Sequence, residues 1–230
     1  MGHTGKLTTE DPLVWFSRAA GKLRTLWLMR TYPFASFGKG AWAHYSIHVE
    51  RAEAPYISIG ENVGLARDAR LEARPPAGTE RAVLILEEGC ALQRRCVISA
   101  RNCIHVMRNV IFGPSVLVAD HGLEMEERMD PTGSGKEKAR GTIRIEEECW
   151  IGFGAVIVCE QGELVIGRHS VVGTNSVVRC SIPPYSVFAG DPARIVKQYD
   201  PSKEKWILGS IRPEAAAVRQ DPEPAASTLS

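Results

Sequence analysis

The sequence has almost no net charge and no long apolar segment, and each shortage excludes a class of protein. Its 28 Lys and Arg residues nearly balance its 27 Asp and Glu residues, so the formal net charge is +1. Such a chain has no overall field that would recruit nucleic acid. The apolar run at residues 26–29 is too short to span a bilayer, and the polar residues 1–11 do not read as a secretory signal. We therefore expect a cytoplasmic protein with no nucleic-acid partner.

What the sequence does contain is an apolar residue at every sixth position. The stretch that begins at Val106 reads VMRNVI, FGPSVL and VADH, and it ends on His121. A period of six is a multiple of the strand period of two and does not match the helical period of about 3.6, so it predicts short strands separated by regular turns. We call these apolar residues the anchors. They are Ile59, Leu65, Leu71, Leu86, Leu92, Ile98, Val106, Phe112, Val118, Ile145, Ile151, Ile157, Ile166, Val172 and Val178.

A second repeated position lies four residues after most anchors and holds small or β-branched side chains. Three of the six cysteines, Cys90, Cys96 and Cys149, fall there, so we interpret them as reduced packing residues rather than as disulfide partners. The full set of these second-slot residues is Val63, Ala69, Cys90, Cys96, Val110, Val116, Cys149, Ala155, Ser170 and Ser176.

These repeats resemble those of the hexapeptide-repeat proteins over residues 57–197. The resemblance implies an all-β fold, a left-handed parallel β-helix in which three hexads form one coil of a prism. Coils stacked about 4.8 Å apart would align the anchors as apolar ladders inside the prism. Outside it we expect an N-terminal helix and irregular cap over 1–56, a short C-terminal helix over 198–212 and a disordered tail over 213–230.

Residues 12–32 predict the N-terminal helix, which is amphipathic and basic. Apolar side chains recur there at helical spacing, and the charged residues are all cations. One interpretation is a cap on the open first coil, because terminal repeats need covering. The other is peripheral contact with the inner face of a membrane, where cations meet anionic lipid. The residues concerned are Phe16, Ala19, Ala20, Leu23, Leu26 and Trp27 on the apolar side, and Arg18, Lys22, Arg24 and Arg30 among the cations.

A charged insertion over 122–141 interrupts the repeat directly after His121. Long insertions in compact domains are usually functional or disordered, and the position of this one predicts a lid over a site. Because an imidazole can take up and return a proton near neutral pH, we expect His121 to act as a general base. Asp120 is the candidate for orienting its ring.

A second block runs from Trp150 through Pro183-Pro184-Tyr185-Ser186 to Ala189-Gly190-Asp191-Pro192-Ala193-Arg194. With the Asp-His-Gly triplet it resembles the hexapeptide O-acetyltransferases that act on galactosides, maltose and exopolysaccharides. The resemblance implies a homotrimer with acetyl-coenzyme A bound between subunits, direct transfer of the acetyl group, and a saccharide acceptor. The residues that match positions near the donor are Trp150, Gly152, Thr174, Arg179, Arg194 and Lys197.

Two other interpretations stay open from the sequence, and a third, a metal enzyme, is not favoured by the residues. Transfer to the amino group of an amino sugar needs the same donor site. A non-catalytic solenoid that binds or scaffolds needs only the fold. A zinc enzyme on this solenoid would need three converging histidines, and His44, His48, His105 and His169 lack that spacing, so we expect no metal.

Overall fold

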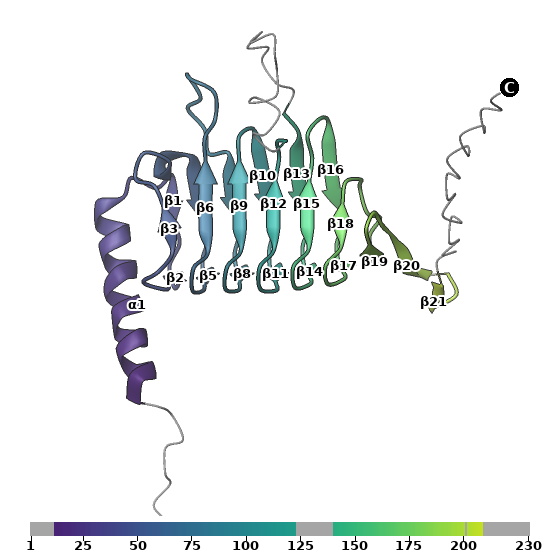
Figure 1. Ribbon diagram of the computed structural model, residues 1–230, viewed down its shortest axis with the longest axis horizontal. Helices are drawn as coiled ribbons and strands as arrows, with labels where there is room; N and C mark the ends of the chain where they lie inside the picture. Colours follow the sequence, from purple (N-terminus) through teal and green to yellow (C-terminus); the bar gives the residue numbers. More distant parts are fainter. Residues whose placement is uncertain (1–11, 123–139, 201, 209–230) are drawn as a thin grey trace, which may run out of the picture.

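The computed structural model describes residues 12–122, 140–200 and 202–208 (Figure 1). Helix α1 (Pro12–Thr31) precedes a prism of stacked coils, and a β-hairpin follows it. The predicted lid lies almost wholly in residues 123–139 and the predicted tail in 213–230, so both lie outside the described residues.

Three sheets form the three faces of the prism, and their strands pair in parallel except at β20 and β21. Sheet A comprises β1 (Ser36–Phe37), β4 (Ile57–Ile59), β7 (Leu84–Leu86), β10 (Cys103–Val106), β13 (Thr142–Ile145) and β16 (Glu163–Ile166). Sheet B comprises β2 (Trp42–Ala43), β5 (Gly64–Leu65), β8 (Ala91–Leu92), β11 (Ile111–Phe112), β14 (Trp150–Ile151) and β17 (Val171–Val172), followed by β19 (Ser186–Gly190), β20 (Ala193–Asp200) and β21 (Lys205–Leu208). Sheet C comprises β3 (His48–Val49), β6 (Arg70–Ala73), β9 (Val97–Ala100), β12 (Leu117–Ala119), β15 (Val156–Val158) and β18 (Val177–Val178). A short 3₁₀ helix, η1 (Ala54–Tyr56), links β3 to β4.

The register between strands confirms the predicted ladders. On sheet C, for example, Ile98 pairs with Leu71 and with Val118 in the coils on either side. Every anchor has at most 1% of its surface exposed, and the second-slot residues are equally buried. The six-residue period therefore sets both the face and the coil on which each side chain lies.

The inward cysteines are free thiols, as expected. Cys90 and Cys96 donate to the carbonyl oxygens of Met107 and Gly113, at 3.0 Å and 3.1 Å. Burial raises the pKa of Cys90, Cys96 and Cys149 to about 11 in each case. These thiols are neutral packing groups at physiological pH.

The prism begins one coil earlier than we predicted. Phe37, Ala43 and Val49 pair with anchors of the next coil and are themselves six residues apart. The second slot after Val49 holds Glu53, a buried charge that masks the repeat in the sequence. Its carboxylate accepts the backbone N–H of Ala73 at 3.1 Å and the Nε–H of Arg74, so the charge is satisfied inside the corner.

The predicted C-terminal helix over 198–212 was wrong for the residues that the structure describes. Residues 193–200 and 205–208 are instead strands β20 and β21, which continue sheet B in antiparallel fashion from β19. The last coil of a solenoid leaves unpaired backbone groups at its edge. Pairing with that edge satisfies more of the chain's N–H and C=O groups than a short isolated helix would.

Helix α1 lies at the opposite end of the prism, beside strand β2 of the first coil (Figure 1). The side chain of Leu28 is fully buried. Thr25 Oγ1 accepts the N–H of Ala43 at 2.9 Å and donates to Gly21, so the helix is tied to strand β2. No helix in the described part of the chain is long and apolar enough to cross a membrane.

Candidate active site

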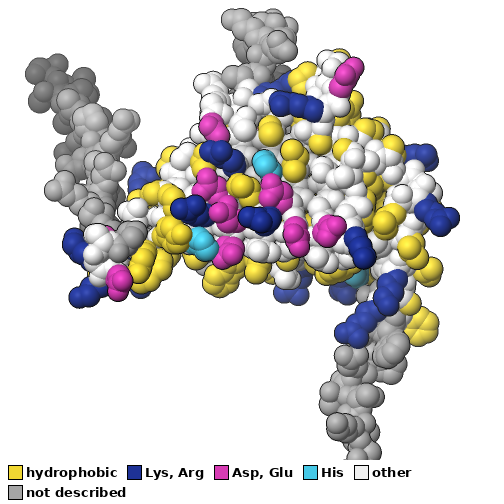
Figure 2. Space-filling view, turned by 180° about the vertical axis from the view of Figure 1, so that it is seen from behind, with side chains coloured by type: hydrophobic (Ala, Val, Ile, Leu, Met, Phe, Trp, Pro, Cys, Tyr) yellow, Lys and Arg dark blue, Asp and Glu magenta, His cyan; other side chains and the backbone are white. Residues whose placement is uncertain are grey.

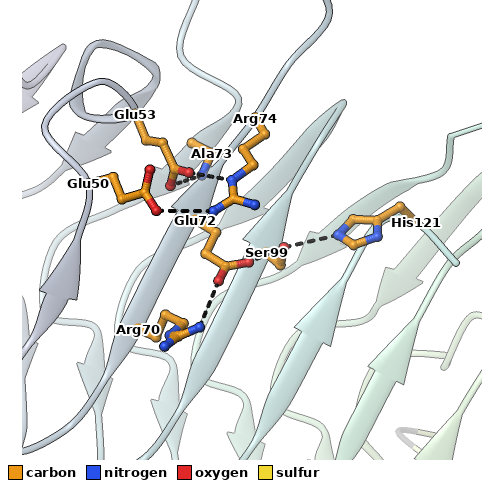
Figure 3. Close-up of polar contacts among 8 residues, drawn as sticks. All are labelled: Glu50, Glu53, Arg70, Glu72, Ala73, Arg74, Ser99 and His121. Carbon is orange, nitrogen blue, oxygen red and sulfur yellow. Dashed lines mark hydrogen bonds and ion pairs between the residues drawn. The ribbon is translucent and has the colours of Figure 1, made fainter. Parts of the chain in front are cut away.

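His121 lies just beyond β12, at the corner where the chain passes from sheet C to sheet A. Its Nδ1 atom is 2.9 Å from the carbonyl oxygen of Gly122. A carbonyl oxygen only accepts hydrogen bonds, so Nδ1 carries a proton and, in the neutral ring, Nε2 carries the lone pair. Nε2 lies 3.0 Å from Oγ of Ser99 (Figure 3).

A chain of polar contacts continues from Ser99 across sheet C (Figure 3). The hydroxyl of Ser99 donates to Oε2 of Glu72 at 2.9 Å, and the other carboxylate oxygen of Glu72 accepts from Arg70 at 3.3 Å. Glu72, Ser99 and Ala119 are partners in one register row of β6, β9 and β12. Ser99 is only 9% exposed, so its contacts are shielded from water.

The structure gives Asp120 partners other than the imidazole it was expected to orient. Its side chain is fully buried, and its oxygens accept the backbone N–H groups of Arg101, Asn102 and Cys103 at 2.7 to 2.8 Å. These three residues form the corner of the preceding coil. Asp120 therefore fixes the backbone on which His121 stands, which agrees with the opposite directions of neighbouring side chains in extended chain.

A second ionic cluster supports the corner one coil further back (Figure 3). Arg74, which follows β6, contacts both Glu53 and the exposed Glu50. The hydrogen bond that Arg74 donates to the carboxylate of Glu53 raises the pKa of Arg74 above its ordinary value. Because Glu53 is buried and Arg74 is half exposed, the pair anchors the start of the segment that leads to β7.

Four of the predicted donor residues lie on or beside sheet B. Trp150 is 57% exposed, and one register row joins it through Val171 and Val187 to Lys197. Arg194 pairs with Ala189, two residues beyond Val187, and so lies on the same outer face. Gly152 follows Ile151 at the corner toward sheet C, and a Cβ atom there would lie 2.7 Å from the backbone nitrogen of Thr174. Gly152 thus allows the coil that carries Thr174 to stack closely.

The outer row of sheet B is apolar along most of its length. Sheet A, the face seen in Figure 2, instead shows acidic, basic and hydrophobic side chains side by side. The row on sheet B consists of Trp42, Gly64, Ala91, Ile111, Trp150, Val171 and Val187.

Arg179 lies away from the other predicted donor residues. It follows β18 at the end of sheet C, in line with Val158 and Ala119 of the earlier coils. The structure therefore places Arg179 at the same corner as His121, two coils further on. Sheet B is the face opposite this corner, along the bottom of the prism in Figure 1. A single chain does not bring Trp150 and His121 together.

In the described part of the chain, no three His, Cys, Asp or Glu side chains converge as metal ligands do. His105 instead contacts Glu87 at 2.7 Å, and His169 contacts Glu148 at 3.1 Å. Burial and the charge of Arg67 lower the pKa of His44.

Sequence reasoning missed Ser99 and Glu72, although the repeat held the signal. Each directly follows an anchor of sheet C, Ile98 and Leu71 respectively. Counting hexads from Val118 would have placed both in the row that leads to His121.

No family model matches the chain. Its sequence is 27% identical over 156 residues to the putative lipopolysaccharide biosynthesis O-acetyl transferase WbbJ of Escherichia coli, covering 65% of this chain and 76% of that protein. It is 34% identical over 134 residues to a probable acetyltransferase of Mycobacterium tuberculosis, covering 56% and 43%. It is 39% identical over 76 residues to the serine acetyltransferase of Haemophilus influenzae, covering 33% and 27%. The chain thus spans less than half the length of the last two relatives.

A solved structure shares the fold. It is that of a variant of AntD, an N-acyltransferase from Bacillus cereus, in complex with dTDP-4-amino-4,6-dideoxyglucose and coenzyme A. The TM-score is 0.59 at 20% identity, over 74% of this chain and 87% of that one. The chain therefore has the left-handed parallel β-helix fold of the hexapeptide-repeat proteins, and the relatives that its sequence resembles are named as acetyltransferases.

Proposed function

We propose that the protein transfers the acetyl group of acetyl-coenzyme A to a hydroxyl group of a saccharide or saccharide-containing acceptor. The observation that carries this proposal is how the ring of His121 is held, with its Nδ1 atom 2.9 Å from the carbonyl oxygen of Gly122. Its Nδ1–H is fixed on the carbonyl oxygen of Gly122, so Nε2 is free to accept a proton in the neutral ring. The O-acetyltransferase WbbJ and the other acetyltransferase relatives supply the class of reaction.

The reaction is a direct transfer. Nε2 of His121 removes the proton of the acceptor hydroxyl while the oxygen of that hydroxyl attacks the thioester carbon of acetyl-coenzyme A. The tetrahedral intermediate then collapses, the carbon–sulfur bond breaks, and Nε2 returns the proton to the departing thiolate. Acetylated acceptor and free coenzyme A result, and the imidazole ends in its starting state.

The outer face of sheet B has the chemistry to hold the donor. A flat indole beside small residues suits a thin pantetheine arm, and Trp150 next to the Gly152 corner provides both. The nucleotide end carries phosphates, which guanidinium and ammonium groups bind well. Lys197 and Arg194 lie further along the same face as Trp150. Thr174 lies beside the proposed pantetheine site, at the corner between sheets B and C. Arg179 places a cation at the other corner, the one that carries His121.

The opposite positions of Trp150 and His121 support a site shared between subunits. We propose a homotrimer in which the His121 corner of one subunit faces sheet B of its neighbour. The apolar outer row of sheet B would then be covered by the adjacent subunit and by the donor. Asp120 serves this site by holding the corner backbone rather than by touching the substrate.

A thiol-release assay tests the reaction. The full chain is incubated with acetyl-coenzyme A and a panel of sugars, nucleotide sugars and amino sugars, and free coenzyme A is measured. Release with a hydroxyl acceptor supports O-transfer. Release only with amino sugars would replace it by N-transfer, the reaction class of AntD. No release above hydrolysis with any acceptor would contradict the proposal.

We also propose that α1 contacts a membrane surface. Its buried side faces β2, yet Phe16 and Leu23 remain 76% and 69% exposed, and Leu26, Trp27 and Met29 are also exposed. Basic and hydrophobic side chains lie together on this helix, at the lower right in Figure 2. This combination is typical of interfacial helices.

Vesicle co-sedimentation tests the membrane contact. The full chain should pellet with vesicles that contain phosphatidylserine, and the Leu23→Glu/Leu26→Glu variant should not. Both positions are exposed, so the variant keeps the buried contacts of Thr25 and Leu28. Equal recovery of both proteins in the supernatant would contradict the contact.

A further inference from the structure

The Ser99 hydroxyl has one proton and two acceptors within reach. Oε2 of Glu72 lies 2.9 Å from Oγ on one side, and Nε2 of His121 lies 3.0 Å from it on the other. A serine hydroxyl donates one hydrogen bond and accepts two. With the ring neutral, the hydroxyl can donate to Glu72 or to Nε2, but not to both at once.

The shortage disappears when the ring gains a proton. Nε2 then donates to Oγ of Ser99, and the hydroxyl donates to Glu72. Nδ1 keeps its bond to Gly122 throughout. Within the series Gly122, His121, Ser99 and Glu72, every contact is a protein–protein hydrogen bond only when the ring is charged.

The surroundings strengthen this arrangement. Ser99 is nine-tenths buried, and hydrogen bonds that involve ionised groups gain in strength where water is excluded. The side chain of Glu72 is 22% exposed. Because Arg70 binds Oε1 of this carboxylate, Oε2 stays directed at Ser99.

We propose that Glu72 and Ser99 form a hydrogen-bond relay that holds the imidazolium of His121 during acyl transfer. The inference rests on the proposed function and adds two residues to it. When Nε2 takes the proton of the acceptor hydroxyl, its one N–H is shared between the substrate and Oγ of Ser99, and the Ser99 hydroxyl donates its own hydrogen bond to Glu72. When the thiolate leaves, Nε2 returns its proton to sulfur and the chain relaxes. Glu72 is a positioning residue that acts through Ser99, and neither residue changes its own protonation.

The variants follow from this assignment. Ser99→Ala removes the relay hydroxyl, and Glu72→Gln replaces its acceptor by an amide that can donate in the wrong direction. Each should lower kcat about 10- to 100-fold, the range for hydrogen bonds to charged groups, with KM for acetyl-coenzyme A unchanged. Ser99→Thr keeps the hydroxyl and should retain most of the activity. Glu50→Gln makes the same chemical change in the neighbouring ionic cluster and should have no effect.

The double variant distinguishes a relay from two separate effects. If Glu72 acts through Ser99, Ser99→Ala/Glu72→Gln should be about as slow as Ser99→Ala alone. If the losses multiply instead, the two residues act independently and the relay is wrong. Equal losses in Glu50→Gln and Glu72→Gln would reduce Glu72 to a member of a structural charge cluster.

A measurement without substrate separates the relay from the proposed function. In ¹⁵N spectra of the full chain under mildly acidic conditions, the Nε2–H proton of His121 should be protected from exchange with water. The signal of this proton should disappear through exchange with water in Ser99→Ala, and it should remain visible in Glu50→Gln. Protection together with an absence of acyl transfer would retain the relay and contradict the reaction. Rapid exchange in the unaltered chain would contradict the relay even if the enzyme is active.

Discussion

The Nε2 atom of His121 lies 3.0 Å from Oγ of Ser99, which is 22 residues earlier in the chain. The two meet because β9 and β12 belong to successive coils and pair directly on sheet C. A histidine at the end of a loop would otherwise be a mobile surface group. The coil beneath it, together with the bond to Gly122, gives its ring a fixed tautomer and direction.

Replacing His121 by alanine should leave the fold intact and remove general-base catalysis. The side chain lies outside the apolar ladders, so the thermal transition should stay unchanged. We expect kcat to fall about 10²- to 10⁴-fold, the contribution of a positioned base. The measurement is coenzyme A release at saturating donor. His105→Gln changes an outward histidine of sheet A and serves as the control, and activity near that of the control would exclude His121 as the base.

Trp150→Ala should weaken donor binding more than it slows the chemical step. The indole offers an exposed flat surface on the face that also carries Lys197, and it lies away from the base of its own chain. We expect KM for acetyl-coenzyme A to rise about 3- to 10-fold with a smaller change in kcat. Trp42→Ala is matched to it, because Trp42 is 52% exposed in the same row of sheet B. Identical changes in the two variants would place the donor elsewhere.

Asp120→Ala should destabilise the protein as a whole. It would leave the buried corner without the acceptor for three backbone N–H groups. We expect the free energy of unfolding to fall by roughly 3 to 5 kcal/mol, since each lost charge-assisted bond leaves an unpaired donor. Urea denaturation measures the change. An Asp120→Ala protein as stable as the unaltered chain but with lower activity would restore a direct catalytic role for this carboxylate.

The free energy of unfolding should decrease as the pH rises above 9, because the folded chain keeps its buried cysteine thiols protonated. Burial raises the pKa of Cys90, Cys96 and Cys149 from 9.0 to about 11. Below pH 9.0, the ordinary pKa of a thiol in the unfolded chain, both the folded and the unfolded chain keep these thiols protonated, and the free energy of unfolding does not change. Between 9.0 and about 11 the unfolded chain loses protons that the folded chain keeps, so unfolding is favoured.

Urea midpoints across that interval test this sign. The midpoint should fall in the unaltered chain and fall less when all three cysteines are replaced by alanine or valine. In the native state the exposed Cys180 should react promptly with a thiol reagent, whereas the three buried thiols should react only after unfolding. A midpoint that stays constant up to pH 11 would contradict the assignment.

The sequence by itself determined the prism, because a six-residue period assigns each side chain to a face and a depth before any contact is known. Leu86, Leu92 and Ile98, for example, follow one another at intervals of six residues, and all three lie in the core. The period also identified His121 as the residue at which the repeat is interrupted. It failed at the two ends, where Glu53 replaces an apolar slot and where β20 and β21 form because the last coil leaves an open edge.

Only the tertiary structure decided how the site residues combine. Glu72 and Ser99 are ordinary polar residues in the sequence, and they acquire a role because stacking brings successive coils within hydrogen-bond distance. Asp120 is next to His121 in the chain, yet extended backbone turns its carboxylate inward to three amides. Trp150 and His121 lie on opposite sides of one prism, since the fold has three faces and each hexad can reach only one of them.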